Sequence, residues 1–252
     1  MSDELYDGAR LEDLTPEDLV GFILDLSHRI AVHHALWFRE VEHQLGMKKA
    51  LDILEETAEK SRNISINRLS KTLGFEVNNG LPQPLLNMPR EKLLQLTSDL
   101  GKNWLAMDGV WFQAVEKAYG MNDAKRSNDS CWHRFSQVEA RMIKNFLGLP
   151  AQAGLKGLEQ ALGYRLYAQV NQQSILEESP TSIVFQMNDC RVQSARKRKG
   201  MDDYPCKSAG LVEYSRFAWE IDERIHTECI GCPPDAHPPE WFCAWRFVLK
   251  SK

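Results

Sequence analysis

The sequence predicts an α+β protein: duplicated helical hairpins form a four-helix bundle, followed by a small antiparallel-sheet domain with helices on one face. Three observations predict this fold class. A repeat fills most of the first 149 residues, β-rich alternation appears after Pro150, and five of the six cysteines lie at or beyond position 190 of the 252-residue chain. Because helical and strand-rich segments are segregated along the chain, an α+β arrangement is expected rather than an alternating α/β one.

The repeat pairs residues 13–75 with residues 87–149 at an offset of 74 residues. Its strongest part is the motif Trp-Phe-x-x-Val-Glu-x-x-x-Gly-Met-x-x-Ala, which occurs at residues 37–50 and again at residues 111–124. One offset without a gap aligns both stretches and their flanks. We therefore interpret them as two copies of one structural unit.

Each copy is predicted to contain two helices that are broken at a glycine. The first helix of each copy begins near residues 15–18 or 89–92, where proline suits a first turn and carboxylates suit the helix dipole. It is expected to end at Gly46 or Gly120. The second helix runs to the Leu-Gly pair that closes the copy, since glycine is favoured just past a helix end. Residues 81–89, with three prolines, form the connector.

The pattern changes after Pro150, where β-rich residues begin to alternate with polar ones. The predicted order is a helix, a hairpin, two helices and a second hairpin. These elements are expected over residues 154–168, 167–176 with 182–187, 189–199 with 208–222, and 224–230 with 241–249. The predicted domains are therefore a helical domain of two repeats, 13–149, and a cysteine-rich α+β domain, 150–252.

Composition limits the class of function. The formal net charge is −4, which does not indicate general affinity for nucleic acid. No apolar run approaches the ~20 residues that span a bilayer, and the acidic start lacks the features of a signal peptide. We expect a cytoplasmic protein with a small-molecule partner, without a nucleic-acid or membrane partner, and able to form a homodimer. In a reducing compartment its cysteines are expected to be ligands, nucleophiles or small buried side chains rather than disulfides.

The pair Cys229 and Cys232 predicts a metal site in the C-terminal domain. A short loop can turn both sulfurs toward one ion, and His226 and His237 are near enough in sequence to complete a tetrahedral set. Cys190 is a further candidate ligand. The metal expected is zinc or iron, although buried structural cysteines would explain the same residues equally well.

Cys206 supports a different hypothesis, a thiol active site. It precedes a predicted helix and is followed by Lys207, an environment that lowers a thiol pKa toward reactivity. His237 and Asp235 are the candidate base and orienting group of such a catalytic site. An ordinary cysteine at a loop-to-helix junction is the competing interpretation.

Several C-terminal motifs resemble an uncharacterised family of prokaryotic cytosolic proteins that also carries the Trp-Phe helical repeat. The resemblance lies in residues 189–193, 196–200, 204–207, 210–214 and 229–238. It implies no activity. More distantly, dispersed cysteines on a strand-rich domain behind a helical region are similar to the L-2-amino-thiazoline-4-carboxylate hydrolases and the four-vinyl-reductase ligand-binding domains.

Two functions follow from these observations. The first is a small-molecule-binding or sensing protein with a cysteine-rich metal site in its C-terminal domain. The alternative is a hydrolase in which a thiolate or a metal-bound water attacks a C–N or C–S bond of a small cyclic or amide substrate. The first is favoured because the cluster holds more thiols than one nucleophile requires.

Overall fold

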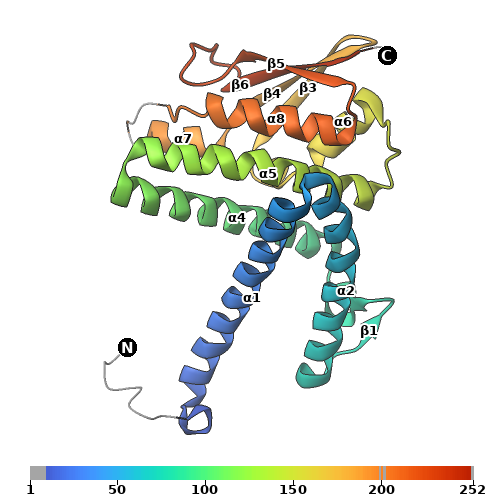
Figure 1. Cartoon of the computed structure of the whole chain (residues 1–252), viewed down its shortest axis with the longest axis vertical. Coiled ribbons are helices and arrows are strands. Elements are labelled where there is room, and N and C mark those ends of the chain that lie inside the picture. Colours follow the sequence, from blue (N-terminus) through green and yellow to red (C-terminus); the bar gives the residue numbers. More distant parts are fainter. Residues whose placement is uncertain (1–9, 199, 201–202, 251–252) are drawn as a thin grey trace. The chain divides into compact units, whose positions relative to one another are not determined.

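The computed structural model of the chain describes residues 10–198, 200 and 203–250 (Figure 1). The chain divides into two compact units, Met1–Leu73 and Gly74–Lys252. This division falls near the end of the first copy of the repeat, so the units differ from the predicted domains 13–149 and 150–252. A four-helix bundle made by both copies stays a prediction.

The N-terminal unit is the first helical hairpin. After a short 3₁₀ turn, η1 (Leu11–Asp13), it contains α1 (Pro16–Leu45) and α2 (Met47–Leu73). Thr15 caps α1, because its hydroxyl oxygen accepts a hydrogen bond from the backbone N–H of Asp18 at 3.2 Å. The break between the helices is at Gly46, whose φ of 85° is a conformation that other residues rarely adopt. Both helix ends therefore follow from local chemistry.

The C-terminal unit opens with the connector and the second hairpin. Its first elements are β1 (Val77–Asn78), β2 (Leu81–Pro82), α3 (Gln83–Leu86), α4 (Arg90–Tyr119) and α5 (Met121–Leu147). The break between α4 and α5 is at Gly120, with a φ of 90° that matches its counterpart in the first copy. The two copies thus have the same helix boundaries, as the repeat predicts.

The rest of the unit confirms the predicted α+β fold class. Its elements are α6 (Gly154–Gly163), η2 (Leu166–Gln169), β3 (Gln172–Ser179), β4 (Ser182–Asp189), α7 (Arg191–Arg198), α8 (Lys207–Ile221), β5 (Ile225–Gly231) and β6 (Cys243–Leu249). The first predicted strand began too early, because a 3₁₀ turn occupies residues 166–169. Lys199, the last residue of the predicted helix 189–199, lies outside the described residues. None of the described helices has both the length and the apolar character needed to cross a bilayer.

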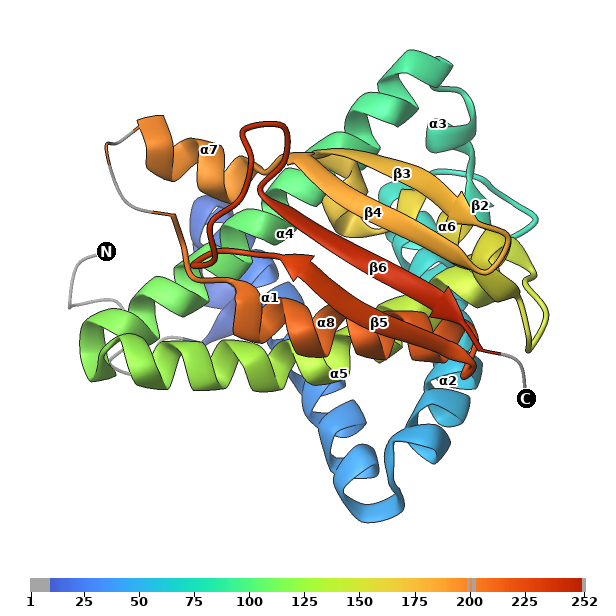
Figure 2. The same cartoon turned by 90° about the horizontal axis from the view of Figure 1, so that it is seen from above.

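Strands β3 to β6 form one antiparallel sheet in the order β3-β4-β6-β5 (Figure 2). Phe185 of β4 pairs with Ile175 of β3 on one side and with Trp245 of β6 on the other. Helices α6 and α8 lie along one face, and α5 packs on the far side of α8. On the other face, Arg246 forms ion pairs with Glu178 and Glu228 of the flanking strands.

The core lies between α8 and the sheet. Trp245 is fully buried and stacks on Tyr214 of α8 with ring centroids 4.8 Å apart. Gly210 allows this close approach, since a Cβ atom there would lie 2.5 Å from the indole ring of Trp245. The N-terminal half of α8 is therefore held directly against the centre of the sheet.

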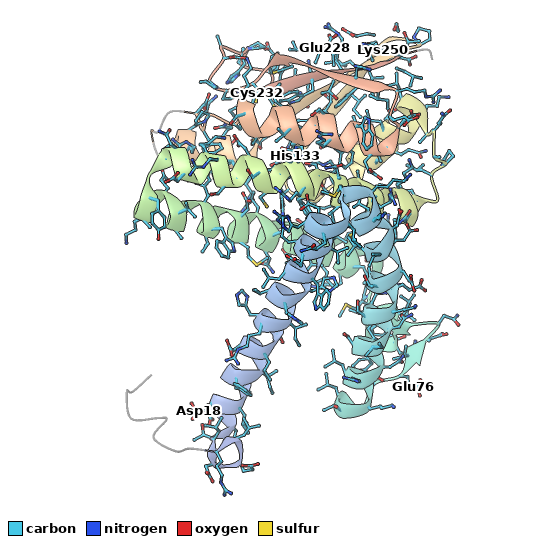
Figure 3. All side chains as sticks on the ribbon, in the orientation of Figure 1. Asp18, Glu76, His133, Glu228, Cys232 and Lys250 are labelled. Carbon is cyan, nitrogen blue, oxygen red and sulfur yellow. The ribbon has the colours of Figure 1, made fainter. Side chains whose placement is uncertain are left out.

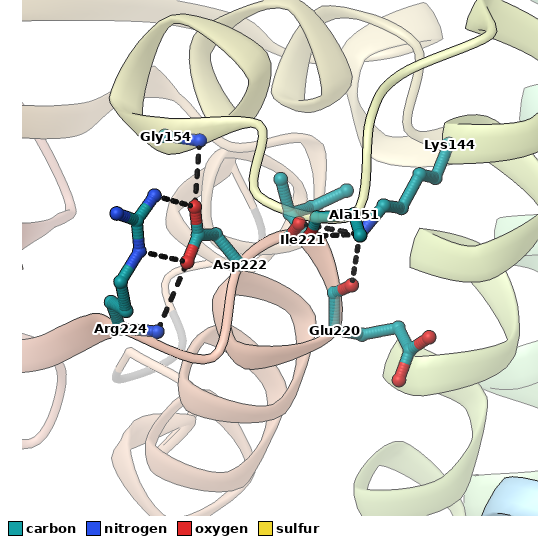
Figure 4. A network of polar contacts seen from close by, with 7 residues as sticks. All are labelled: Lys144, Ala151, Gly154, Glu220, Ile221, Asp222 and Arg224. Carbon is teal, nitrogen blue, oxygen red and sulfur yellow. Dashed lines mark hydrogen bonds and ion pairs between the residues drawn. The ribbon is translucent and has the colours of Figure 1, made fainter.

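Polar contacts fix the opposite end of α8 (Figure 4). Asp222 accepts hydrogen bonds from the backbone N–H of Gly154 at 2.9 Å and from the guanidinium of Arg224. The ammonium group of Lys144, on α5, donates to the carbonyl oxygens of Glu220 and Ile221. A cation at the carbonyl end of a helix is favourable. These contacts join α5, α6, α8 and β5 at the C-terminal end of α8. The candidate site lies at the N-terminal end of this helix.

Candidate functional site

A cavity of about 720 Å³ lies within the C-terminal unit. Helix α4 supplies Leu105 and Phe112 to its wall, and α5 supplies Trp132. Helices α7 and α8 and the ends of β4 and β6 complete the wall, with Met187 and Cys243 from the sheet. The volume falls in the range of ordinary small-molecule sites, which is about 300–1,000 Å³.

Aromatic side chains form two parts of this wall. Trp132 and Tyr167 stack with ring centroids 5.4 Å apart and an angle of 10° between their planes. Phe112 meets Tyr204 edge to face at 5.2 Å. Packed aromatic pairs give rigid, largely apolar surfaces. The wall is therefore suited to a flat or ring-bearing molecule.

Among the residues that the structure describes, two of the cavity wall carry a buried polar atom that has neither a hydrogen bond nor an ion pair. These atoms are the side-chain nitrogen of Asn171 and the hydroxyl oxygen of Tyr204. The other amide atom of Asn171 is engaged, since its oxygen accepts the backbone N–H of Arg191 at 2.9 Å. Because buried polar groups are nearly always paired, these two atoms are candidate contacts for a bound molecule.

One residue of the cavity wall belongs to a buried ion cluster. Arg165, on the segment before η2, is 2% exposed and pairs with Glu139 of α5 at 2.9 Å and with Glu213 of α8 at 2.7 Å. Glu213 also lines the cavity, and burial raises its pKa to about 7 although Arg165 opposes this shift. Burial also raises the pKa of Asp108, on α4. Glu213 is thus a cavity carboxyl group that can bind or release a proton near neutral pH.

Four of the six cysteines line the cavity: Cys190, Cys206, Cys232 and Cys243. The sulfur atoms of Cys206 and Cys232 are 3.6 Å apart. Cys232 is buried, near the N-terminal end of α8 (Figure 3), and Cys206 is partly buried at the N-cap of that helix. All six cysteines are free thiols. Four of the five cysteines in the last quarter of the chain therefore line one cavity.

Local contacts hold this thiol pair in place. The side-chain amide of Gln193 donates to the carbonyl of Tyr204 and accepts its backbone N–H, both at 2.8 Å. The backbone N–H of Lys207 donates to the carbonyl of Pro233 at 2.9 Å, and the Lys207 ammonium pairs with Asp235 at 2.7 Å. These contacts attach the start of α8 to α7 and to the turn after β5. Both cysteines therefore lie on anchored backbone.

The two sulfurs have opposite acid–base properties. The hydrogen bond from Cys232 lowers the pKa of the Cys206 thiol, and burial opposes this shift. The hydrogen bond with Cys206, a further one with Cys243 and burial raise the pKa of Cys232. Burial raises the pKa of Cys190 to about 12. Within the pair, Cys206 is therefore the sulfur that loses its proton more readily.

The structure separates the two β5 residues of the predicted metal site. His226 is exposed, whereas Cys229 is half-buried and belongs to the inward-facing set of the strand. Residues three apart on a strand point to opposite faces, so these side chains cannot share an ion while β5 is intact. Burial raises the pKa of Cys229, which does not line the cavity.

His237 and Asp235 each have partners of their own. One ring nitrogen of His237 contacts Asp203 at 3.1 Å and the other contacts the carbonyl of Pro238 at 2.9 Å. These contacts raise the pKa of His237, although burial, the largest single effect, opposes them. Asp235 pairs with Lys207. In contrast, the sulfur of Cys206 is hydrogen-bonded to Gln193 and Cys232, so the structure does not show the predicted thiol–histidine contact.

Within residues 10–198, 200 and 203–250, no three His, Cys, Asp or Glu side chains are arranged to hold a metal ion. Of the predicted ligands, Cys190 and Cys232 line the cavity, and His226, Cys229 and His237 do not. The predicted set is therefore not brought together. The cysteines that do line one cavity include Cys243, which is buried and was not among the predicted ligands.

The sequence reasoning missed the polar framework of the site. Gln193, Arg165 and Glu213 are buried but were given no role. A signal existed for Glu213, since it lies one turn before Phe217 on the buried face of α8. A carboxylate at a core position needs a charged partner. No comparable signal identifies Arg165, whose partners lie 26 and 48 positions away along the chain.

Comparison with known proteins gives one match. Residues 12–88 and 86–249 match a family of unknown function, DUF6125. This agrees with the resemblance to an uncharacterised family. No curated protein and no solved structure matches the chain.

Proposed function

From the cavity of this chain, which belongs to the DUF6125 family of unknown function, we propose that the protein binds a small, largely apolar molecule. The molecule carries a ring and a hydrogen-bond acceptor. The observation that carries this proposal is the 720 Å³ cavity with aromatic walls and two unpaired polar atoms. The rings of Trp132 and Phe112 suit the apolar body of the ligand. The nitrogen of Asn171 and the hydroxyl of Tyr204 suit its polar group.

Gly109 offers a direct test. It lines the cavity on α4, and a Cβ atom there would meet nothing within 4 Å. The substitution Gly109→Trp is therefore expected to fill the cavity without a clash in its wall. Gly21, on α1, has the same open surroundings and is far from this cavity in sequence. Gly21→Trp is thus the matched control.

The probe for this test is 1-anilinonaphthalene-8-sulfonate, an aromatic anion whose fluorescence rises in apolar sites. We expect Gly109→Trp to weaken its binding at least tenfold, about 1.4 kcal/mol, whereas Gly21→Trp leaves it unchanged. Circular dichroism establishes that both variants are folded. Equal binding by Gly109→Trp and the unaltered protein would exclude the cavity as the binding site.

A metal site would be a further part of this function, with cavity thiols as the ligands. Zinc or iron would have to be held by a set other than the predicted one, with Cys190, Cys206, Cys232 and Cys243 as the thiols nearest to a common site. Metal analysis of protein purified without oxygen tests it. A stoichiometric metal that is lost in Cys232→Ser but kept in Cys229→Ser would establish this set, and protein without metal would exclude it.

The alternative, a thiol hydrolase, is favoured by one observation: Cys206 lines the cavity and has a lowered pKa. Such an enzyme attacks a carbonyl-like carbon with the thiolate. Cys206 would need a base other than His237, whose ring nitrogens face Asp203 and Pro238. Selective alkylation of Cys206 by iodoacetamide at neutral pH would support this alternative, and uniform slow alkylation of all cysteines would contradict it.

A further inference from the structure

The pair formed by Cys206 and Cys232 has a geometry that neither ligand binding nor hydrolysis requires. The two sulfurs come from segments 26 residues apart and approach to 3.6 Å. A disulfide has an S–S distance of about 2.05 Å. A closure of about 1.5 Å, within the reach of side-chain rotation, would therefore bond them.

Hydrogen bonds and an ion pair already join the two segments that carry the pair. Lys207, next to Cys206, donates its N–H to Pro233, next to Cys232. The Lys207–Asp235 ion pair and the Asp235 N–H, which donates to the carbonyl of Cys232, add to this hold. Since disulfides need a specific backbone separation, this pre-existing link reduces the rearrangement that bond formation would need.

The two sulfurs differ in access. Cys206 is partly buried, whereas Cys232 is 1% exposed. Since Cys206 is the more exposed of the two, a reagent is expected to react with Cys206 before it reacts with Cys232. An accessible sulfur with a buried neighbour is the arrangement needed for attack followed by resolution.

We propose that Cys206 and Cys232 form a thiol–disulfide exchange site that reduces small disulfides. The Cys206 thiolate attacks one sulfur of a disulfide RS–SR, forms a Cys206–SR bond and releases RS⁻. Cys232 then passes its proton to the RS⁻ that the first step released and attacks the Cys206 sulfur, which releases the second RS⁻ and forms the Cys206–Cys232 disulfide. Two protein thiols are oxidised, one small disulfide is reduced to two thiols, and no other reactant is needed. The acid–base difference between the sulfurs supports this order, because only a thiolate attacks.

This inference is independent of the proposed ligand function, since it requires two sulfurs and no bound ligand. The test uses the full chain with Cys131→Ser, which removes the exposed cysteine of α5. The fully reduced protein is mixed with one equivalent of dithiobis(nitrobenzoate), an aromatic disulfide that releases a coloured thiolate. We expect two equivalents of thiolate per protein and a cross-link between Cys206 and Cys232 in the peptide map.

The added substitution Cys232→Ser is expected to lose the second release and keep the aromatic thiol attached to Cys206. Cys229→Ser, which removes a half-buried thiol that does not line the cavity, is the matched control and should release two equivalents. Three outcomes would overturn the proposal: no reaction at Cys206, a stable adduct on Cys206 with both cysteines present, or a cross-link from Cys232 to Cys243. The peptide map of the otherwise unaltered chain decides the question even if a serine variant fails to fold.

Discussion

The two helical hairpins share a sequence motif and helix boundaries, yet they differ in how they are buried. Of the second helices, α2 buries only Ala50 and Leu51. Its counterpart α5 buries a continuous face: Ala124, Trp132, Ser136, Gln137, Glu139, Ala140 and Ile143. At the offset of 74 residues, Trp132 replaces Ala58 and Glu139 replaces Ser65. The two copies therefore differ in the residues of their second helix. Of these two helices, only α5 has a buried face of this extent.

The two hairpins also differ in the cavities that their residues line. The first hairpin has a smaller apolar pocket of about 240 Å³, lined by Trp37, Phe38 and Leu54 among others. In the second copy, Leu54 is replaced by Asn128, and His34 is replaced by Asp108. Both replacements line the larger cavity. The two copies thus share their helix boundaries and differ in the polar residues that they contribute to a cavity.

The largest expected difference between the copies concerns tryptophan. Trp132 is 4% exposed and stacks on Tyr167, whereas Trp37 is 62% exposed. Trp132→Ala should lower the free energy of unfolding by about 4 kcal/mol through loss of buried contacts and an unfilled cavity. Trp37→Ala should change it by less than about 1 kcal/mol. Denaturant titration measures both, and equal losses would show that the two hairpins are buried alike.

A second substitution removes a buried charge from the second copy. Glu139→Ser, which introduces the residue found at position 65, leaves Arg165 buried with Glu213 as its remaining carboxylate partner. Breaking a buried ion cluster typically costs about 3 kcal/mol. The matched control is Glu59→Ser, on the exposed surface of α2. A loss below 1 kcal/mol in Glu139→Ser would indicate that Arg165 does not depend on this carboxylate.

Two polar residues of the larger cavity can be exchanged for the residues at the equivalent positions of the first copy. Asp108→His with Asn128→Leu reproduces the residues at positions 34 and 54. If these groups determine the chemistry of the cavity, binding of 1-anilinonaphthalene-8-sulfonate should change about tenfold, or 1.4 kcal/mol. The reverse exchange in the first copy, His34→Asp with Leu54→Asn, should leave binding unchanged. A change in both variants would place the probe on a surface common to the two hairpins.

A pH dependence of stability is also expected from Glu213, on α8. Burial raises the pKa of Glu213, which ion-pairs with the Arg165 held by α5, to about 7. The folded state therefore holds a proton that the unfolded state releases near pH 4.5, so this contribution to stability is full below pH 4.5 and is lost as pH rises through 7. The slope is at most about 1.4 kcal/mol per pH unit.

Glu213→Gln should remove this slope from the unfolding free energy measured between pH 5 and 8. Glu116→Gln, which removes another carboxylate that lines the same cavity, is the control and should retain the slope. An identical pH profile in Glu213→Gln and the unaltered protein would show that Glu213 is ionised throughout this range.

Local chemistry explains why so much of the fold was predictable. Gly46 and Gly120 end their helices because their positive φ values suit glycine, and the repeat extended this inference from one copy to the other. Strand alternation located β4, β5 and β6 within a few residues. The same alternation could have excluded His226 as a partner of Cys229, since residues three apart on a strand face opposite sides.

The sequence by itself determined the duplicated hairpins, the order of elements after Pro150 and the cysteine-rich end of the chain. Only the tertiary structure decided which cysteines meet. Cys206 and Cys232 come together because α8 packs on the sheet and Lys207 binds the turn after β5. Glu213 and Arg165 likewise meet across the core. Helix ends and strand faces depend on neighbours along the chain, whereas a site depends on neighbours in space, which spacing in one sequence does not specify.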